Sequence, residues 1–452
     1  LNTRFVATNK AYNSFGLVTG ITDALGNAVR FEYDNAYLYP ILATNALGHQ
    51  ERFVYDNATG NVLEKSDVNG TLWRSEYDAL GRTVAVFGPG GAKLSEFFYN
   101  DDAMPRSVTA HNFANAADYY ETIEYFDGLE RPVQKRISSE IAGRYSVVSY
   151  SYNTRGELSF ETYPIFESGS AYTGVSSSAA QRSFQYDALS RITRETTPAG
   201  AVTSSYGSWT VTVTDANGNR RIVAHDAEGK LVSATEFLNA QQLVTSYMYN
   251  PAGNLVEIRD AAGNIRTFTY DSLGRLKNED DLHAPADTTF SKWQYIYDDN
   301  GNRISARNSD KKSISYYYDS LNRLTREQMF EKAGNETITY EYDAGVFGKG
   351  RLTKASRTGV EIAYEYDAFG RVQDETRTIN NIQYLSHSDY DLRGNITKAI
   401  LPNRSSLSYK YNSAGLLKNA TLYDNSGSKF PIIKGKTYTA TQQIDAIALA
   451  NG

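Results

Sequence analysis

The chain has 452 residues, a formal net charge of -6 at pH 7 and no cysteine. The acidic balance is unlike that of a nucleic-acid binder, which carries a basic stripe, and the absence of cysteine excludes disulfides and thiolate metal sites. The sequence therefore predicts no nucleic-acid partner. It also predicts no membrane span, because no apolar run approaches the roughly 20 residues that a membrane helix needs.

Tyrosine dominates the aromatic residues, with 35 Tyr against 19 Phe and 3 Trp, beside 34 Gly and 10 Pro. Tyrosine favours strands, whereas Gly, Asn and Asp favour tight turns, so the composition predicts many short strands. The length exceeds that of most single compact domains and favours a repeat or multi-domain architecture. The chain starts at Leu1 without a signal segment, and we expect a fragment of a longer chain.

One short phrase recurs along the chain: an aromatic anchor, Asp or Asn, two variable residues, Gly, one variable residue and an aliphatic residue. Its cleanest copies begin at Tyr77, Tyr270 and Tyr366. The 39-residue gap after Tyr186 contains Tyr206, which we interpret as a decayed copy. Neighbouring anchors are usually 21 to 24 residues apart, which identifies an internal repeat. In chain order the anchors are Tyr12, Tyr33, Tyr55, Tyr77, Tyr99, Phe126, Tyr152, Tyr186, His225, Tyr249, Tyr270, Tyr297, Tyr318, Tyr342, Tyr366, Tyr390 and Tyr411.

A second glycine often lies seven residues before the anchor, as Gly70 does before Tyr77 and Gly263 before Tyr270. Each repeat is therefore predicted to contain two turns and two short strands. Asp or Asn at the start of a turn accepts a hydrogen bond from a backbone N–H two residues later. Glycine supplies the positive φ that closes a type I turn with a bulge.

The strands between these turns carry aromatic residues two positions apart, such as Phe31 and Tyr33, which places both rings on one face. Arginines after the turns can lay their stems along the rings and reach a turn carboxylate. A short strand cannot bury such a face alone, so the sequence predicts stacked antiparallel hairpins in one quasi-linear sheet. The candidate structural residues of the repeat turns are Tyr77, Asp78, Gly81, Arg82, Tyr270, Asp271, Gly274, Arg275, Tyr366, Asp367, Gly370 and Arg371.

The rhythm is interrupted in four places, which we expect to be loops or small decorations on a single array over residues 1–452. The first interruption contains a candidate short helix over Asn112–Tyr125. None is long enough to form an independent domain. The interruptions lie near residues 101–124, 163–183, 277–292 and 418–437, and the last is expected to form a looser hairpin around Asp424–Gly427.

These repeats resemble the RHS/YD-repeat family, from Tyr12 to about Gly452. The section from Tyr163 through Tyr186 to Trp209 and Asp215–Asn219 looks most like the repeat shell of insecticidal toxin-complex (Tc) B/C components and of Rhs polymorphic toxins. The resemblance implies an all-β array of antiparallel hairpins wound into a curved sheet. That sheet would be part of a hollow shell, or cocoon, around a C-terminal toxic domain.

The same resemblance implies a bacterial protein that is secreted or held at the cell surface. Its implied partners are the rest of the same RHS chain, the enclosed toxin domain and a toxin-delivery protein. The family's shell typically closes with a self-cleaving element, but this sequence contains no Asp-Pro-x-Gly phrase of that kind. Self-cleavage and toxic activity are therefore not assigned to it.

No catalytic residue, cofactor or metal site is predicted. Asp298–Asn302 resembles the start of a calcium loop but lacks the later ligands, including the downstream Glu. Phe87–Gly91 is glycine-rich but is not followed by the Lys-Ser pair of a phosphate-binding loop. Glu279–Asp281 offers acidic residues of the kind that form half of a glycosidase pair, without a second carboxylate to complete it. The histidines lie far apart in the sequence, at His49, His111, His225, His283 and His387.

Three functions remain for comparison. The leading hypothesis is a passive, non-catalytic container wall in a toxin system. The second is a cell-surface or wall-associated adhesion or carbohydrate-binding protein, because exposed aromatic rows can bind sugars. The third is a hydrolase, which would need clustered carboxylates with shifted pKa values in one pocket.

Overall fold

The computed structural model describes residues 6–239, 241–310, 312–331 and 334–450. Leu1 and Gly452, the expected limits of the array, lie outside these residues. The described residues form 39 strands and one short 3-10 helix, η1 (Pro89–Gly91), and they contain no α-helix. No helical segment among them is long and apolar enough to cross a bilayer. The all-β fold expected from the tyrosine and glycine content is confirmed.

The strands alternate with turns along the whole described chain. They are β1 (Asn9–Tyr12), β2 (Val18–Thr22), β3 (Ala28–Tyr33), β4 (Pro40–Thr44), β5 (Gln50–Tyr55), β6 (Val62–Ser66), β7 (Leu72–Tyr77), β8 (Thr83–Phe87), β9 (Lys93–Asn100), β10 (Arg106–Phe113), β11 (Tyr119–Phe126), β12 (Pro132–Ser138), β13 (Arg144–Tyr152), β14 (Leu158–Thr162), β15 (Ile165–Ser168), β16 (Gln181–Tyr186), β17 (Ile192–Thr197), β18 (Gly200–Tyr206), β19 (Thr210–Thr214), β20 (Arg220–His225), β21 (Leu231–Leu238), β22 (Gln241–Tyr249), β23 (Leu255–Arg259), β24 (Ile265–Tyr270), β25 (Leu276–Asp280), β26 (Lys292–Tyr297), β27 (Arg303–Asn308), β28 (Ser313–Tyr318), β29 (Leu324–Glu331), β30 (Gly334–Tyr342), β31 (Leu352–Arg357), β32 (Val360–Tyr366), β33 (Val372–Ile379), β34 (Ile382–Tyr390), β35 (Ile396–Ile400), β36 (Ser406–Tyr411), β37 (Leu417–Tyr423), β38 (Lys429–Tyr438) and β39 (Ile444–Leu449).

The strands form one continuous antiparallel sheet, in which nearly every strand pairs with the next strand along the chain. The exception is β13, which pairs with β14 through Tyr150–Tyr152 and with β15 through Arg144–Val147. Strand β14 then pairs with β16, so that β15 is a side branch and the sheet continues past it. The predicted quasi-linear array of hairpins is thus confirmed.

Most anchor tyrosines lie at a β-bulge, where the register shifts. Tyr270, for example, lies opposite Leu276, and the shift falls between Thr269 and Tyr270. Such a shift disrupts the ladder of backbone hydrogen bonds. The carbonyl of Leu276 accepts a hydrogen bond from the hydroxyl of the next anchor, Tyr297, at 2.9 Å. Most hairpins are therefore tied to the next at the point where their own ladder is weakest.

This hydroxyl-to-carbonyl hydrogen bond recurs along the sheet, at O···O distances from 2.5 to 3.0 Å. It includes Tyr206, whose hydroxyl donates to the carbonyl of Ile192, so the decayed copy inferred from the sequence keeps the structural bond. The donors are Tyr33, Tyr77, Tyr99, Tyr152, Tyr186, Tyr206, Tyr249, Tyr297, Tyr318, Tyr342, Tyr366, Tyr390, Tyr411 and Tyr438.

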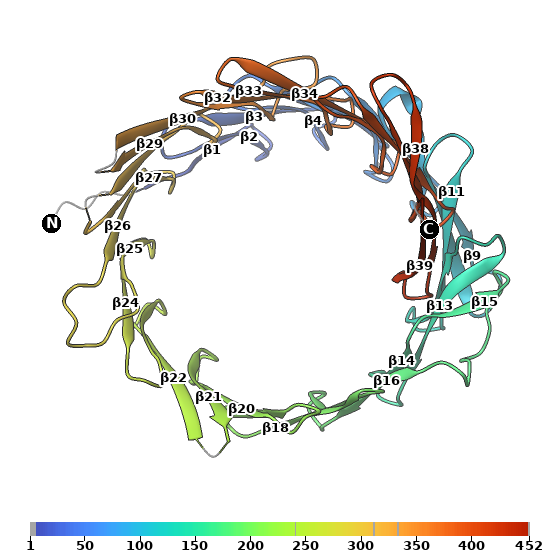
Figure 1. The fold of residues 1–452 in the computed structure, drawn as a ribbon, viewed down its shortest axis with the longest axis horizontal. Coiled ribbons are helices and arrows are strands. Elements are labelled where there is room, and N and C mark those ends of the chain that lie inside the picture. Colours follow the sequence, from blue (N-terminus) through green and yellow to red (C-terminus); the bar gives the residue numbers. More distant parts are fainter. Residues whose placement is uncertain (1–5, 240, 311, 332–333, 451–452) are drawn as a thin grey trace.

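The strip winds round a central space and passes its own starting point (Figure 1). Hydrogen bonds between residues 272 to 294 positions apart in the chain join the two passes. We call residues 9–280 the first coil and residues 292–449 the second coil. One revolution of the wall thus takes roughly twelve hairpins, because the β2–β3 turn meets the β26–β27 turn.

The helix expected over Asn112–Tyr125 is wrong. These residues belong to β10 and β11, which pair with each other over their whole length. The physical reason is the period of the apolar residues: Ile123 and Tyr125 are buried while their neighbours are more exposed, which is the two-residue alternation of a strand.

The looser hairpin expected around Asp424–Gly427 is formed by β37 and β38, which pair with each other, and the other two interruptions also contain wall strands beside their loops. Strands β37 and β38 occupy most of residues 418–437, and β25 begins the segment at 277–292. Residues 163–183 contain β15 and a strap that covers β12. There the guanidinium of Arg136, which is fully buried, donates to Glu167 at 2.8 Å and to the carbonyl of Gly169 at 2.9 Å.

The hydroxyl bonds give a direct prediction. Replacing Tyr297 by Phe removes the hydrogen bond to Leu276 and leaves that carbonyl without its donor, which should cost about 1 kcal/mol of unfolding free energy. The matched control is Tyr270→Phe, because the Tyr270 hydroxyl makes no such bond to a described residue and its loss should be nearly neutral. Urea unfolding measures both, and equal effects in the two variants would contradict the assignment.

Candidate functional site: the two edges of the wall

The turns that follow the anchors all lie along one edge of the strip, which we call the YD edge. In the turn after Tyr77, one carboxylate oxygen of Asp78 accepts from the backbone N–H groups of Leu80 and Arg82, both at 2.9 Å. Its second oxygen accepts from Nε of Arg82 at 2.8 Å. Gly81 has a φ of 77°, a left-handed conformation that L-residues adopt only at a cost. The turns at Asp271 and Asp367 repeat this arrangement.

The arginines of these turns reach the next repeat. The guanidinium of Arg82 lies 4.0 Å from the ring centre of Tyr99 and donates to Asp101 at 2.7 Å. Arg275 and Arg371 lie over the rings of Tyr297 and Tyr390 and donate to the backbone carbonyls of the following turns. Each arginine therefore joins its own turn, the next anchor ring and the next turn, which explains why Arg follows Gly in the repeat.

These contacts keep the turn carboxylates charged. Hydrogen bonds from Arg131 hold the pKa of Asp127 below its ordinary value, and Arg191 and Arg323 do the same for the pKa values of Asp187 and Asp343. Because the folded pKa is depressed, the stabilisation is present above the unfolded pKa of about 3.9. It is lost only as the pH falls through the lower folded value.

The second set of turns lies along the opposite edge, which we call the return edge. It includes residues 23–27, 45–49, 67–71, 114–118 and 139–144 in the first coil. These turns contact the YD edge of the second coil, and we call this contact the seam. The strip therefore closes by joining its two different edges, one from each coil.

The seam is mainly polar. Asn300 donates to Asp23 at 2.6 Å, and the amide of Asn69 both accepts from and donates to the backbone of Lys349. Ser413 donates to the carbonyl of Ser139 at 2.7 Å. Sequence reasoning missed these pairs, because turn residues so far apart in the chain share no spacing that links them.

One apolar contact lies within the seam. The rings of Trp73 and Phe369 meet edge-to-face with their centres 5.9 Å apart. Phe369 also lies against Gly88, where an added Cβ would come within 2.9 Å of its ring. The side chain two positions after the turn Asp is thus covered in this copy of the repeat.

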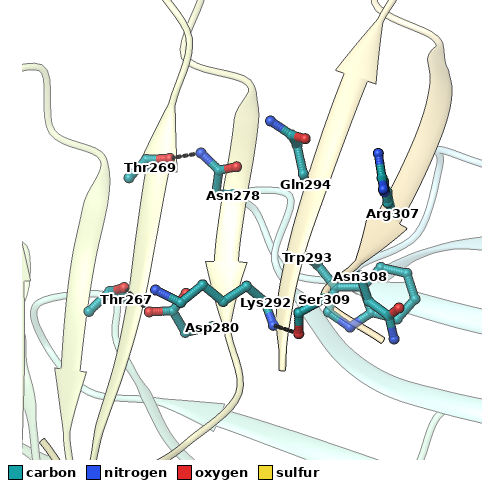
Figure 2. Close-up of a pocket in the computed structure, with 10 residues that line it drawn as sticks. All are labelled: Thr267, Thr269, Asn278, Asp280, Lys292, Trp293, Gln294, Arg307, Asn308 and Ser309. Carbon is teal, nitrogen blue, oxygen red and sulfur yellow. Dashed lines mark hydrogen bonds between the residues drawn. The ribbon is translucent and has the colours of Figure 1, made fainter. Parts of the chain in front are cut away.

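A polar cavity of about 480 Å3 lies across β24–β27 (Figure 2). Thr267 donates to Asp280 there at 2.6 Å, and Asn278 donates to Thr269 at 2.7 Å. Among the described residues, Asp280 is the only carboxylate that lines this cavity, so the cavity does not bring together the clustered carboxylates that a hydrolase needs. Within the described residues, Lys292 and Arg307 form no ion pair.

The other sequence candidates fall into ordinary structural roles. Glu279 and Asp280 are consecutive strand residues and therefore point to opposite faces, so they cannot form a catalytic pair. The calcium-like phrase at Asp298–Asn302 is a YD turn. Both carboxylate oxygens of Asp298 accept hydrogen bonds from Asn302, one from its backbone N–H and one from its side-chain amide. Phe87–Gly91 forms the end of β8 and η1.

The histidines remain separate. No group of three or more His, Asp or Glu able to hold a metal ion exists among the residues that the structure describes. His225 ends β20 in an anchor position, and His283 stacks on Phe290 with ring centres 3.4 Å apart. His387 lies between Asp374 and Asp389.

Comparison with known proteins agrees with this architecture. The RHS Repeat family model matches residues 12–50 and 249–281. No curated protein matches the sequence. Among solved structures, the crystal structure of TcdB2-TccC3 matches with a TM-score of 0.88 and 14% identity, over 98% of this chain and 28% of that chain. The Tc holotoxin pore of Photorhabdus luminescens, with a mutated TccC3, matches with a TM-score of 0.86 and 13% identity, over 98% of this chain and 29% of that chain.

The chain thus contains RHS repeats and resembles Tc B/C components, as the sequence indicated. It spans less than a third of the length of the chains that it matches. At this level of identity, the likeness shows a shared fold.

The turn geometry predicts the effect of replacing its glycines. Valine at Gly81, Gly274 or Gly370 should cost about 1–3 kcal/mol, because φ there is 77°, 76° and 79°. An added Cβ at Gly370 also meets the guanidinium of Arg351, but this is the far end of a flexible side chain that can move aside, so the three losses should be of similar size.

Urea unfolding measures these losses. The control is Ser190→Gly, which places glycine in the same turn position at a φ of 61° and should not destabilise the protein. Unchanged stability in all three valine variants would overturn the turn assignment.

Proposed function

We propose that this RHS-repeat protein is the non-catalytic wall of a bacterial toxin shell, which encloses a toxic polypeptide until it is delivered. The single observation that carries the proposal is that the sheet forms a closed ring. The strip surrounds a central space, and its two coils are joined along the seam (Figure 1). Its similarity to Tc toxin structures supports the same role.

A passive role agrees with how the repeat residues are used. The anchor hydroxyls donate to backbone carbonyls, the turn carboxylates accept from backbone N–H groups, and the arginines join neighbouring turns. Groups engaged in this way build a wall and are not available to a substrate.

The proposal extends to location and partners. The shell would be secreted or displayed at the bacterial surface, as part of a toxin complex. Its partners would be the remainder of the RHS shell, the enclosed toxin and a delivery component. These assignments rest on the likeness to TcdB2-TccC3 and to the holotoxin pore.

Limited proteolysis of the full protein that contains this strip tests the proposal. Trp73→Ala with Phe369→Ala removes the aromatic contact of the seam. If the wall encloses another polypeptide, cleavage of that polypeptide should accelerate about tenfold. This factor corresponds to a decrease of about 1.4 kcal/mol in the free energy of opening the seam. Trp209→Ala is the control, because Trp209 is 56% exposed and forms none of the seam contacts.

Mass spectrometry of the early fragments identifies what is protected. Enclosure predicts slow cleavage outside the strip in the intact protein and in the Trp209 variant, and fast cleavage in the seam variant. Equal, fast cleavage in all three proteins would contradict it. Specific binding to a glycan array by the same preparation would instead favour the adhesion hypothesis.

A further inference from the structure

A cavity of about 450 Å3 lies within the seam, where the return turn at 114–118 of the first coil meets YD turns of the second coil. Arg393 and Tyr409 are among the second-coil residues that line it. Beside the cavity, the backbone N–H of Leu392 donates to the carbonyl of Ala114 at 2.8 Å and so joins the two coils. The volume of the cavity is in the range of small-ligand sites.

Arg393 brings an unpartnered guanidinium to this cavity. Its side chain is 14% exposed, and its Nε and Nη1 are buried without a hydrogen-bond partner among the described residues. Of the arginines that the structure describes, Arg393 alone has two such nitrogens. Burying a charged donor without an acceptor is unfavourable, and such groups in folded proteins are usually satisfied by a water or a ligand. The guanidinium therefore requires an acceptor that the wall itself does not provide.

The place of Arg393 in its turn explains why it has no partner. In the repeat turns the arginine lies four residues after the aspartate, and Nε of Arg82 donates in this way to Asp78. Arg393 lies only two residues after Asp391. The fourth position is Asn395, whose side chain donates to the same carboxylate at 2.9 Å. Nε of Arg393 is left 3.8 Å from Asp391, beyond hydrogen-bond distance, so the carboxylate offsets part of the charge but is not an acceptor.

Both coils border this guanidinium. It lies 5.5 Å from the ring centre of Tyr120 in the first coil. In the second coil it lies against Gly415, where an added Cβ would be 3.2 Å from Nη1. An aromatic ring and a glycine leave room for a planar cation, and neither offers it an oxygen acceptor from its side chain. The guanidinium is thus positioned by both coils while its donors stay unpaired.

The carboxylates of the cavity are engaged, whereas other donors are free. Asp118 and Asp391 both line the cavity, and each accepts a hydrogen bond from an asparagine side chain of its own turn, at 2.8 and 2.9 Å. Lys410 also lines the cavity and forms no ion pair within the described part of the chain. The hydroxyl of Tyr409 has no hydrogen-bond partner there. The uncommitted side chains are therefore suited to a ligand that accepts hydrogen bonds and carries negative charge.

We propose that this cavity binds an oxyanion, a carboxylate or phosphate group, through the guanidinium of Arg393. The planar fork of arginine matches both groups, Lys410 adds positive charge and Tyr409 adds a hydroxyl donor. A free ion and an acidic side chain of an enclosed polypeptide carry this chemistry equally. Because both coils line the cavity, a bound anion stabilises the closed seam. The inference goes beyond the enclosing role, since it assigns a ligand to the wall itself.

Calorimetric titration with inorganic phosphate, at constant ionic strength, tests the proposal on the full protein that contains this strip. The wild-type protein should bind phosphate at one saturable site. Arg393→Leu should weaken binding about tenfold or more, because it removes the fork, while Leu80 shows that leucine fits this turn position. Arg393→Lys should lie between them, because it keeps the charge without the fork. The control is Arg194→Leu, at an exposed arginine that bonds only to Thr196, and it should bind like the wild type.

Hydrogen exchange in the wild-type protein keeps the proposal testable if the variants fold poorly. Phosphate should slow exchange of the backbone N–H groups in the turns at 114–118 and 412–416, because these turns border the cavity. The turn at 215–219 does not line the cavity and should be unaffected. An equal change in all three turns would place the anion elsewhere and contradict the proposal.

A photo-cross-link distinguishes the two sources of the oxyanion. Tyr409 is replaced by p-benzoyl-phenylalanine, and mass spectrometry identifies the peptide captured on irradiation. A captured acidic peptide from outside the strip makes a protein carboxylate the ligand, whereas phosphate binding without capture makes it a free ion. Absence of both results overturns the proposal, and so does equal phosphate binding by the wild type and by Arg393→Leu.

Discussion

The hydrogen bond from most anchor tyrosines to the carbonyl at the preceding bulge is the interaction on which the rest of the wall depends. A hairpin of two short strands is barely stable alone, and its bulge leaves part of its ladder disrupted. Tyrosine solves both problems at once, because its ring covers the neighbouring strand while its hydroxyl reaches the disrupted carbonyl. Phenylalanine could supply only the first contribution, which accounts for the excess of Tyr over Phe.

The aspartate and arginine of each turn extend this coupling along the edge. Asp78 accepts the hydrogen bonds that shape its own turn, and the guanidinium of Arg82 contacts the ring of Tyr99 and donates to Asp101 in the next repeat. The edges of the strip are consequently rigid rows of hydrogen-bonding groups. When the strip has completed one revolution, these rows meet and form the seam, so the interactions that build one repeat also determine how the coils join.

The sequence was sufficient to predict the strand-and-turn unit, because that information is local. The interval between Asp78 and Gly81 predicts the turn, and the spacing of Phe31 and Tyr33 predicts the strand. The expected helix over Asn112–Tyr125 failed because helix and strand patterns were not distinguished where the anchor spacing lengthened. The seam was not predictable, since Asn69 and Lys349 become neighbours only through the curvature of the whole sheet. The buried Arg136 network was also missed, because its partners come from the strap that follows β15.

Closure of the strip at the seam is the central claim, and the absence of native cysteine makes it directly measurable. Cysteines are introduced in place of Asn69 and Lys349, and a short thiol cross-linker is added at low protein concentration. The account predicts a rapid cross-link within one chain, identified by mass spectrometry as a peptide joining the two turns. A pair at Asn69 and Asn217, from different parts of the ring, should remain unlinked. Failure of the first pair to react, or equal reaction of both pairs, would contradict a wall closed along this seam.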